Sequence, residues 1–213
     1  RGLRHWLDAV RVVPRELPML PPSMNAAAVR VVYQCLLEGR QVAMSYARRT
    51  ADGTEEMRYH VSPLGLVVRG AVTYLVGTVT PYKDVRQFAL HRVRDAGMTD
   101  AQAVRPRDFD LDRYIAQGGF QYPVGGAVQL VIAVSGWVAT HLAETPLGTD
   151  QTIVAGEGGE QIVRVTVTDS QQLLWWLSSM GEDVRVLAPA ALRERLKRRL
   201  RAALGQYEDG AKR

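Results

Sequence analysis

The sequence predicts an α+β chain of two units: a small, closed or nearly closed five-stranded β-barrel, followed by a ferredoxin-like βαββαβ unit. Two patterns support this prediction. Between residues 40 and 93, apolar side chains recur at every second position in short segments that end in tight turns, which is typical of antiparallel strands in a small barrel. After residue 125, the periodicity alternates in the order strand, helix, strand, strand, helix, strand, helix.

The composition is that of an ordinary globular chain, since 46% of the 213 residues are hydrophobic and 23% are charged. Cys35 is the only cysteine, which excludes a disulfide framework and a Cys-based zinc site. A single cysteine also favours a reducing compartment, so we expect a cytoplasmic protein. No apolar run approaches the ~18 residues that a membrane span needs. Because the chain begins at Arg1 rather than Met, we expect a fragment whose upstream part is missing.

Two helices are expected before the first strand. Apolar residues recur at helical spacing over residues 2–12, which predicts a short amphipathic helix. Four prolines make residues 13–22 an extended linker, because proline interrupts helices and central strands. The next helix is capped by Ser23 or Asn25 and runs to Glu38.

The barrel strands follow at once. Alternating apolar residues and the turns at Asp52-Gly53 and Arg69-Gly70 separate five short segments. These segments are residues 40–46, 57–61, 64–68, 72–76 and 85–93. A mixed connector with a short helix over residues 111–116 leads from the barrel to the second unit.

The second unit is predicted from a longer alternation of strands and helices. Its expected elements are a strand at 129–134, a helix at 137–142, a hairpin at 152–155 and 161–168, a helix at 171–180, a strand at 184–187 and a helix at 190–204. The predicted organisation is a tether helix and linker (1–24), the barrel with its entry helix (25–95), a connector (96–124), the ferredoxin-like unit (125–206) and a tail (207–213).

Charge is distributed unevenly along the chain, whose net charge is +5. Residues 39–94 carry nine Lys or Arg against four acids, and residues 193–213 carry eight against three, so each block has a charge of +5. Residues 125–192 carry two Lys or Arg against seven acids. The basic barrel favours an anionic partner, although a solvated surface paired with the acidic block explains the same pattern.

The last predicted strand is the most informative segment. Arg86, Phe88, Leu90 and Arg92 occupy alternate positions, which places them on one face of a strand. Two guanidinium groups at the ends of an apolar face can hold phosphate while Phe88 or Tyr74 packs against a base. In the alternative interpretation, both arginines pair with acids at the barrel rim and Phe88 belongs to the core. For Tyr46, a hydroxyl bonded to the backbone is the favoured interpretation.

Three short motifs in this order resemble the WYL domain of bacterial transcription regulators: VSPLGLV at 61–67, TYL at 73–75 and RQFALHRV at 86–93. Residues 125–204 resemble the C-terminal extension that commonly follows that domain. At the position of the family's tryptophan, this chain has Thr73. The resemblance covers residues 25–204, most of the chain.

The resemblance implies an Sm-like β-barrel that senses a ligand, often a nucleotide or single-stranded nucleic acid. It also implies an N-terminal winged helix-turn-helix, so we expect duplex DNA to be bound only through that missing domain. The residues expected to bind the ligand are Tyr46, His60, Arg69, Tyr74, Arg86, Phe88 and Arg92.

The preferred interpretation is therefore the effector-sensing and dimerising region of a transcription regulator. A freestanding module for RNA or single-stranded DNA and a ligand-free dimerisation unit remain alternatives. A homodimer is expected because Trp6, Leu7, Val10 and the Trp175-Trp176 pair offer more apolar surface than one small fold covers. No residues combine as nucleophile, base and oxyanion site, so we expect no catalysis, and neither a metal nor a cofactor is expected.

Overall fold

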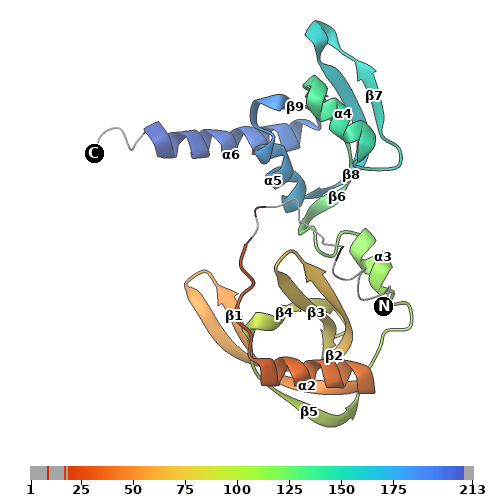
Figure 1. Ribbon diagram of the computed structural model, residues 1–213, viewed down its shortest axis with the longest axis vertical. Helices are drawn as coiled ribbons and strands as arrows, with labels where there is room; N and C mark the ends of the chain where they lie inside the picture. Colours follow the sequence, from red (N-terminus) through yellow and green to blue (C-terminus); the bar gives the residue numbers. More distant parts are fainter. Residues whose placement is uncertain (1–8, 10–16, 18, 209–213) are drawn as a thin grey trace. The chain divides into compact units, whose positions relative to one another are not determined.

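The computed structural model describes Ala9, Leu17 and residues 19–208, in two compact units that comprise Arg1–Leu111 and Asp112–Arg213 (Figure 1). The predicted helix over residues 2–12 and most of the proline-rich linker lie outside the described residues. The apolar residues Trp6, Leu7 and Val10 also lie outside them. No helix in the described part of the chain is long and apolar enough to cross a membrane.

The first unit begins with helix α2 (Ala26–Glu38), whose two ends follow from local chemistry. Asn25 caps its start, since the side chain accepts hydrogen bonds from the backbone N–H groups of Ala27 and Ala28 at 3.1 and 3.2 Å. Gly39 ends the helix in the left-handed region with φ 64°, which glycine adopts without steric cost. The buried face of α2 lies against β1 and β5 (Figure 1).

Five antiparallel strands form one sheet in the order β4-β3-β2-β1-β5. The strands are β1 (Arg40–Thr50), β2 (Gly53–Arg69), β3 (Val72–Val79), β4 (Val85–Ala89) and β5 (Val93–Gln102). The strand pairings of the described residues leave β4 and β5 as the two edges, so the sheet is not closed by hydrogen bonds. A mixed fold with an antiparallel sheet is thus observed, and the Sm-like barrel is not confirmed.

The strand boundaries correct the prediction in two places. Residues 57–61 and 64–68 belong to the single strand β2, because Pro63 lies at a bulge where the register with β3 shifts rather than at a break. The expected strand over residues 85–93 is interrupted by a 3-10 helix, η1 (Leu90–Arg92). After it comes β5, which was missed because its mostly polar sequence has no apolar alternation.

A buried glutamine connects four segments of this unit. The side-chain nitrogen Nε2 of Gln41 in β1 donates to Ser62 Oγ at 3.2 Å and to Thr80 Oγ1 at 3.1 Å. Ser62 Oγ also accepts from the backbone N–H of Val104 at 3.0 Å. The loop after β3 and the segment after β5 are therefore tied to the sheet through these two hydroxyls.

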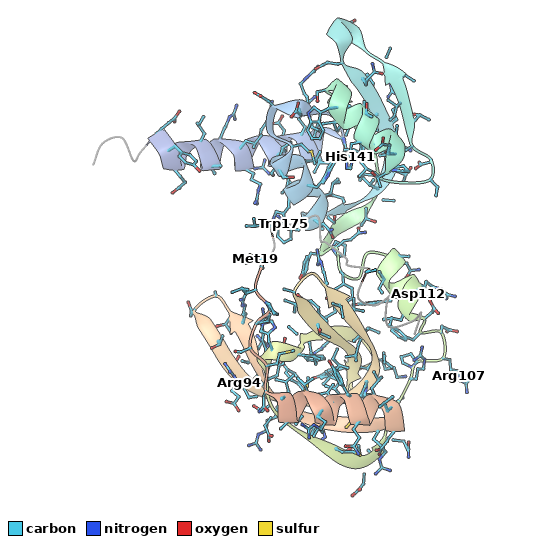
Figure 2. All side chains as sticks on the ribbon, viewed as in Figure 1. Met19, Arg94, Arg107, Asp112, His141 and Trp175 are labelled. Carbon is cyan, nitrogen blue, oxygen red and sulfur yellow. The ribbon has the colours of Figure 1, made fainter. Side chains whose placement is uncertain are left out.

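The second unit begins within the short helix α3 (Leu111–Ala116), after which its elements have the predicted order. These are β6 (Pro123–Val134), α4 (Gly136–Glu144), β7 (Thr152–Ala155), β8 (Gln161–Ser170), α5 (Gln171–Ser179), β9 (Val184–Ala188) and α6 (Ala190–Glu208). The antiparallel strand order β7-β8-β6-β9 is that of a split βαβ arrangement. Leu192 and Leu196 of α6 join its core, whereas Trp175 of α5 is 44% exposed (Figure 2).

We predict that Gln41→Ala destabilises the chain. The substitution leaves the buried Ser62 hydroxyl and Thr80 with fewer hydrogen-bond partners, which costs about 1–3 kcal/mol of unfolding free energy. Urea denaturation followed by circular dichroism measures the loss, and Gln34→Ala, at an exposed position in α2, serves as the control. Equal midpoints for the two variants would contradict the role given to Gln41.

Candidate functional site

The predicted strand face that carries two arginines is not formed. Arg86 and Phe88 lie in β4, but Leu90 and Arg92 lie in η1, where the chain turns before β5. A 3-10 helix has three residues per turn, so alternate positions no longer share a face. The prediction of one continuous face was therefore wrong, and each of its residues has to be placed separately.

Two of the aromatic candidates belong to the core of the first unit. The ring of Phe88 is 4% exposed and lies 5.3 Å from the ring of Tyr46 and 5.4 Å from that of Tyr59, measured between centroids. The Tyr46 hydroxyl accepts a hydrogen bond from the backbone N–H of Ala89 at 3.1 Å. This hydrogen bond confirms the backbone partner favoured for the Tyr46 hydroxyl, and the burial of both rings favours a core role for Tyr46 and Phe88.

Arg86 already has an acidic partner. Its Nε donates to Asp84 Oδ2 at 2.6 Å, and its guanidinium lies 5.4 Å from the centre of the Tyr82 ring. The hydrogen bond from Arg86 lowers the pKa of the Asp84 carboxyl. This is the rim pairing of the alternative interpretation, and it occurs at the start of β4.

His60 lies apart from the other candidates. It is exposed on β2, opposite Ala43 of β1, and lines a pocket of about 390 Å³ together with Arg58 and Asp95. Charges of both signs line this pocket, so it offers no net attraction to an anion. The structure does not bring His60 together with Arg92.

Three basic residues gather at the end of β4, and we call them the Arg49–His91–Arg92 cluster. Burial, followed by the nearby charges of Arg92 and Arg49, lowers the pKa of the His91 imidazole. His91 Nδ1 is buried and has no hydrogen-bond partner. In the part of the chain that the structure describes, no ion pair involves Arg49 or Arg92. The charges of Arg49 and Arg92 both act on His91, so the electrostatic potential in this region favours an anion over a cation.

Two more candidates lie at the same end of the sheet. Tyr74 is paired in register with Ala89, the last residue of β4, and is half-buried. Arg69 is the last residue of β2 and pairs with Val72 at the start of β3. The structure thus brings Arg69, Tyr74 and Arg92 to one end of the sheet. Sequence reasoning missed His91 as a member, because nothing in its local pattern shows that Arg49 lies nearby.

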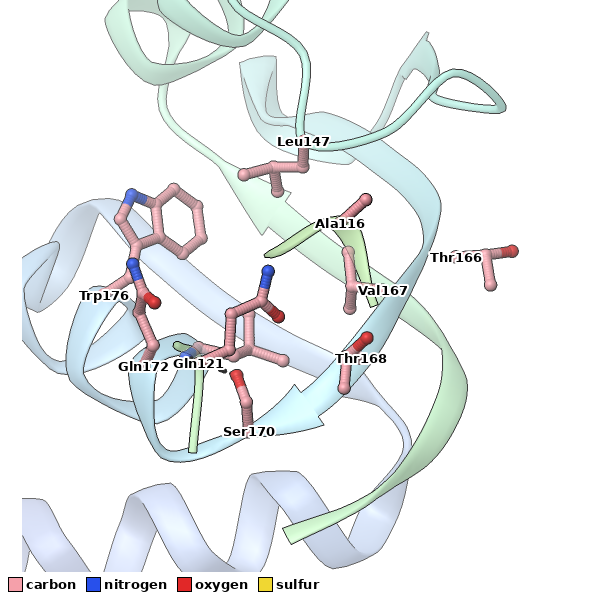
Figure 3. A pocket seen from close by; sticks show the side chains of 10 residues that line it. Ala116, Gln121, Leu147, Thr166, Val167, Thr168, Ser170, Gln172 and Trp176 are labelled. Atoms are coloured by element: carbon pink, nitrogen blue, oxygen red, sulfur yellow. Dashed lines mark hydrogen bonds between the residues drawn. The ribbon is translucent and has the colours of Figure 1, made fainter. Parts of the chain in front are cut away.

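A pocket in the second unit has a different chemistry. It has a volume of about 380 Å³ and lies beside β8 and α5. Amides, hydroxyls and an indole surround it, from Gln121, Thr168, Ser170, Gln172 and Trp176 (Figure 3). No charged side chain lines it, so it gives no preference for an anion. Among the described pockets, the anionic ligand expected from the sequence is better matched in the first unit.

Comparison with known families agrees with the two-unit organisation. Residues 27–98 match the WYL domain, and residues 126–204 match the WCX domain. The chain therefore carries a WYL domain followed by a WCX domain.

Individual relatives can be named on the same basis. The chain is 30% identical to Protein PafB of Mycobacterium tuberculosis (strain ATCC 25618 / H37Rv) over 149 residues, 68% of this chain and 44% of PafB. It is 27% identical to Protein PafC of the same strain over 211 residues, 95% of this chain and 60% of PafC. It therefore spans about half the length of these relatives. The solved structure of proteasome accessory factor B/C (PafBC) of Arthrobacter aurescens is 24% identical, with 91% of this chain and 30% of that chain covered and a TM-score of 0.39.

The lowered pKa of His91 predicts a pH dependence of stability. The unfolded chain takes up the proton at about pH 6.5 and the folded chain only at lower pH, so acidification below about pH 6.5 favours unfolding. We expect the unfolding free energy of the wild type to fall more steeply than that of His91→Gln between about pH 7 and pH 5. Urea denaturation at several pH values measures both slopes. Parallel slopes would show that His91 does not carry this effect.

Proposed function

We propose that the chain is the effector-sensing and dimerising region of a bacterial transcription regulator, and that its WYL domain binds an anionic ligand without catalysing a reaction. The observation that carries the proposal is the Arg49–His91–Arg92 cluster, which gathers cations without an acidic partner in the described structure. Guanidinium groups bind phosphate through paired hydrogen bonds, so a nucleotide or a single-stranded nucleic acid is the ligand class that we favour. Tyr74, beside the cluster, is positioned to contribute stacking.

The proposed mechanism is a shift between conformations. A ligand that binds one arrangement of the regulator more tightly than another increases the population of the first. The relatives extend well beyond the part that matches this chain, since 44% of PafB and 60% of PafC are covered. We therefore assign duplex DNA binding to a region outside this chain. Ligand binding would change the spacing between the DNA-binding regions of two copies.

The ligand prediction is tested with Arg92→Gln. Loss of one charge-assisted phosphate contact should weaken binding of a fluorescein-labelled oligothymidylate by about 1.5–3 kcal/mol, roughly one to two decades in affinity. The log–log salt slope should fall by about 0.7, because one fewer phosphate is contacted. Fluorescence polarisation at several salt concentrations measures both quantities.

Two variants serve as controls for this experiment. Lys197→Gln removes an exposed charge from the second unit and should have little effect. Arg86→Gln should weaken binding less than Arg92→Gln, because Arg86 is engaged by Asp84. If Arg92→Gln and Lys197→Gln gave equal small losses with unchanged salt slopes, the cluster would not be the binding site.

We propose further that two copies associate through the end of α6. Leu200, Leu204 and Tyr207 occupy one side of this helix at helical spacing and are 42%, 56% and 82% exposed. Burial of such a stripe against a second copy would remove its apolar surface from water. Basic residues separate the leucines, so the stripe is narrow.

The dimer is tested by light scattering at micromolar concentration, where the wild-type chain should have twice the monomer mass. Leu204→Glu should shift the mass toward the monomer, because it would bury a carboxylate in the interface. Leu37→Glu, which changes a leucine that is 86% exposed on α2, is the matched control. A monomeric wild type, or equal effects of the two variants, would rule out this interface.

A further inference from the structure

A second basic site lies at the other end of β4, in a cleft of about 530 Å³. We call it the loop cleft, because it lies between the loop after β3, residues 80–84, and the segment after β5, residues 103–107. Its volume is within the range of roughly 300–1,000 Å³ that small-molecule sites occupy. In the cluster, His91 and Arg92 follow the last residue of β4. In the loop cleft, Lys83 precedes its first residue.

The charged lining of the loop cleft is entirely basic. Lys83, Arg105 and Arg107 line it, and no Asp or Glu does (Figure 2 labels Arg107). The acidic residue of the same loop, Asp84, is held by Arg86. In the described structure, neither Lys83 nor Arg107 has an ion pair. The charges of these two side chains are therefore available to an anion.

Arg105 is held in place without being neutralised. Its Nη1 donates to the carbonyl oxygen of Leu64 at 3.3 Å and its Nη2 to that of Phe109 at 3.2 Å. Its guanidinium also lies 5.2 Å from the centre of the Phe109 ring. These partners are neutral, so they fix the position of the guanidinium and leave its positive charge uncompensated.

The rest of the lining combines fixed hydroxyls with apolar surface. Ser62 and Thr80 both accept from the buried Gln41, which holds their oxygens in place. Pro81, Val104, Pro106 and Tyr82 supply the apolar and aromatic part. A ligand would thus meet cations, oriented hydroxyls and an apolar wall in one cleft.

We propose that the loop cleft binds a small organic anion with a phosphate or carboxylate head and an apolar or aromatic body. The three cations select the negative charge of the head, and the proline, valine and tyrosine side chains remove the body from water. This inference does not depend on the Arg49–His91–Arg92 cluster, since the two sites share no residue. It assigns the WYL domain a second, small-molecule site.

Adenosine monophosphate is a suitable probe because it combines a dianionic head with an aromatic body. Calorimetric titration of the whole 213-residue chain should show that it binds at least about tenfold more tightly than adenosine or inorganic phosphate alone. Lys83→Gln/Arg107→Gln should weaken this binding by at least about tenfold. Val104→Trp fills the cleft at a residue that is 66% exposed and should also abolish binding, while all three cations remain.

Matched controls separate the loop cleft from general charge effects. Arg94→Gln/Arg199→Gln removes two exposed charges elsewhere and should change the affinity less than about twofold. The amide resonances of Thr78, Thr80 and Val104 should shift on titration, and they should shift in the same way in Arg92→Gln, because Arg92 does not line the loop cleft. The proposal is overturned if the probe does not bind at millimolar concentration, or if Lys83→Gln/Arg107→Gln has no more effect than the control. Loss of binding only in Arg92→Gln would also overturn it, and would assign the probe to the cluster instead.

Discussion

The end of β4 is held by one hydrogen bond, from the backbone N–H of Ala89 to the hydroxyl of Tyr46. Tyr46 also pairs through its backbone with Val93 in β5, so this single residue holds both ends of η1. Because the chain is held at residues 89 and 93, the three residues between them turn rather than extend. That turn places His91 and Arg92 beside Arg49 and ends the strand face on which Arg86 and Phe88 lie.

The basic residues near the two ends of β4 differ in their ion pairing. At the start, Arg86 is satisfied by Asp84 and contributes mainly to the local structure. At the end, Arg92 and Arg49 have no acidic partner in the described structure, and their charges disfavour protonation of His91. A repulsive group of this kind costs stability in the absence of an anion, and a bound anion recovers that cost. The cluster differs from a solvated basic surface in its lack of acidic partners among the described residues, and not in its total charge.

The pocket of the WCX unit differs from the basic sites of the WYL unit, because no charged side chain lines it. Its pocket beside α5 is lined by amides and hydroxyls, and the half-buried charged pair Asp169 and Arg195 is joined by two hydrogen bonds. The exposed apolar stripe on the last turns of α6 is suited to association with another copy. In the proposed function, the first unit recognises the anion and the second associates with another copy.

The sequence by itself determined the features that depend on neighbouring residues. A cap at Ser23 or Asn25, the end of α2 at Gly39, most strand positions and the βαββαβ order follow from local spacing and turn residues, and the structure confirms them with Asn25 as the cap. Tertiary structure alone decided the bulge at Pro63, the strand β5, the turn at η1 and the burial of Gln41. These features depend on partners that are distant in the sequence: β5 is held by pairing with β1, and His91 acquires its environment from Arg49. The sequence therefore predicted the same role for Arg86 and Arg92, and only the fold separates the two, because pairing with an acid is decided in three dimensions.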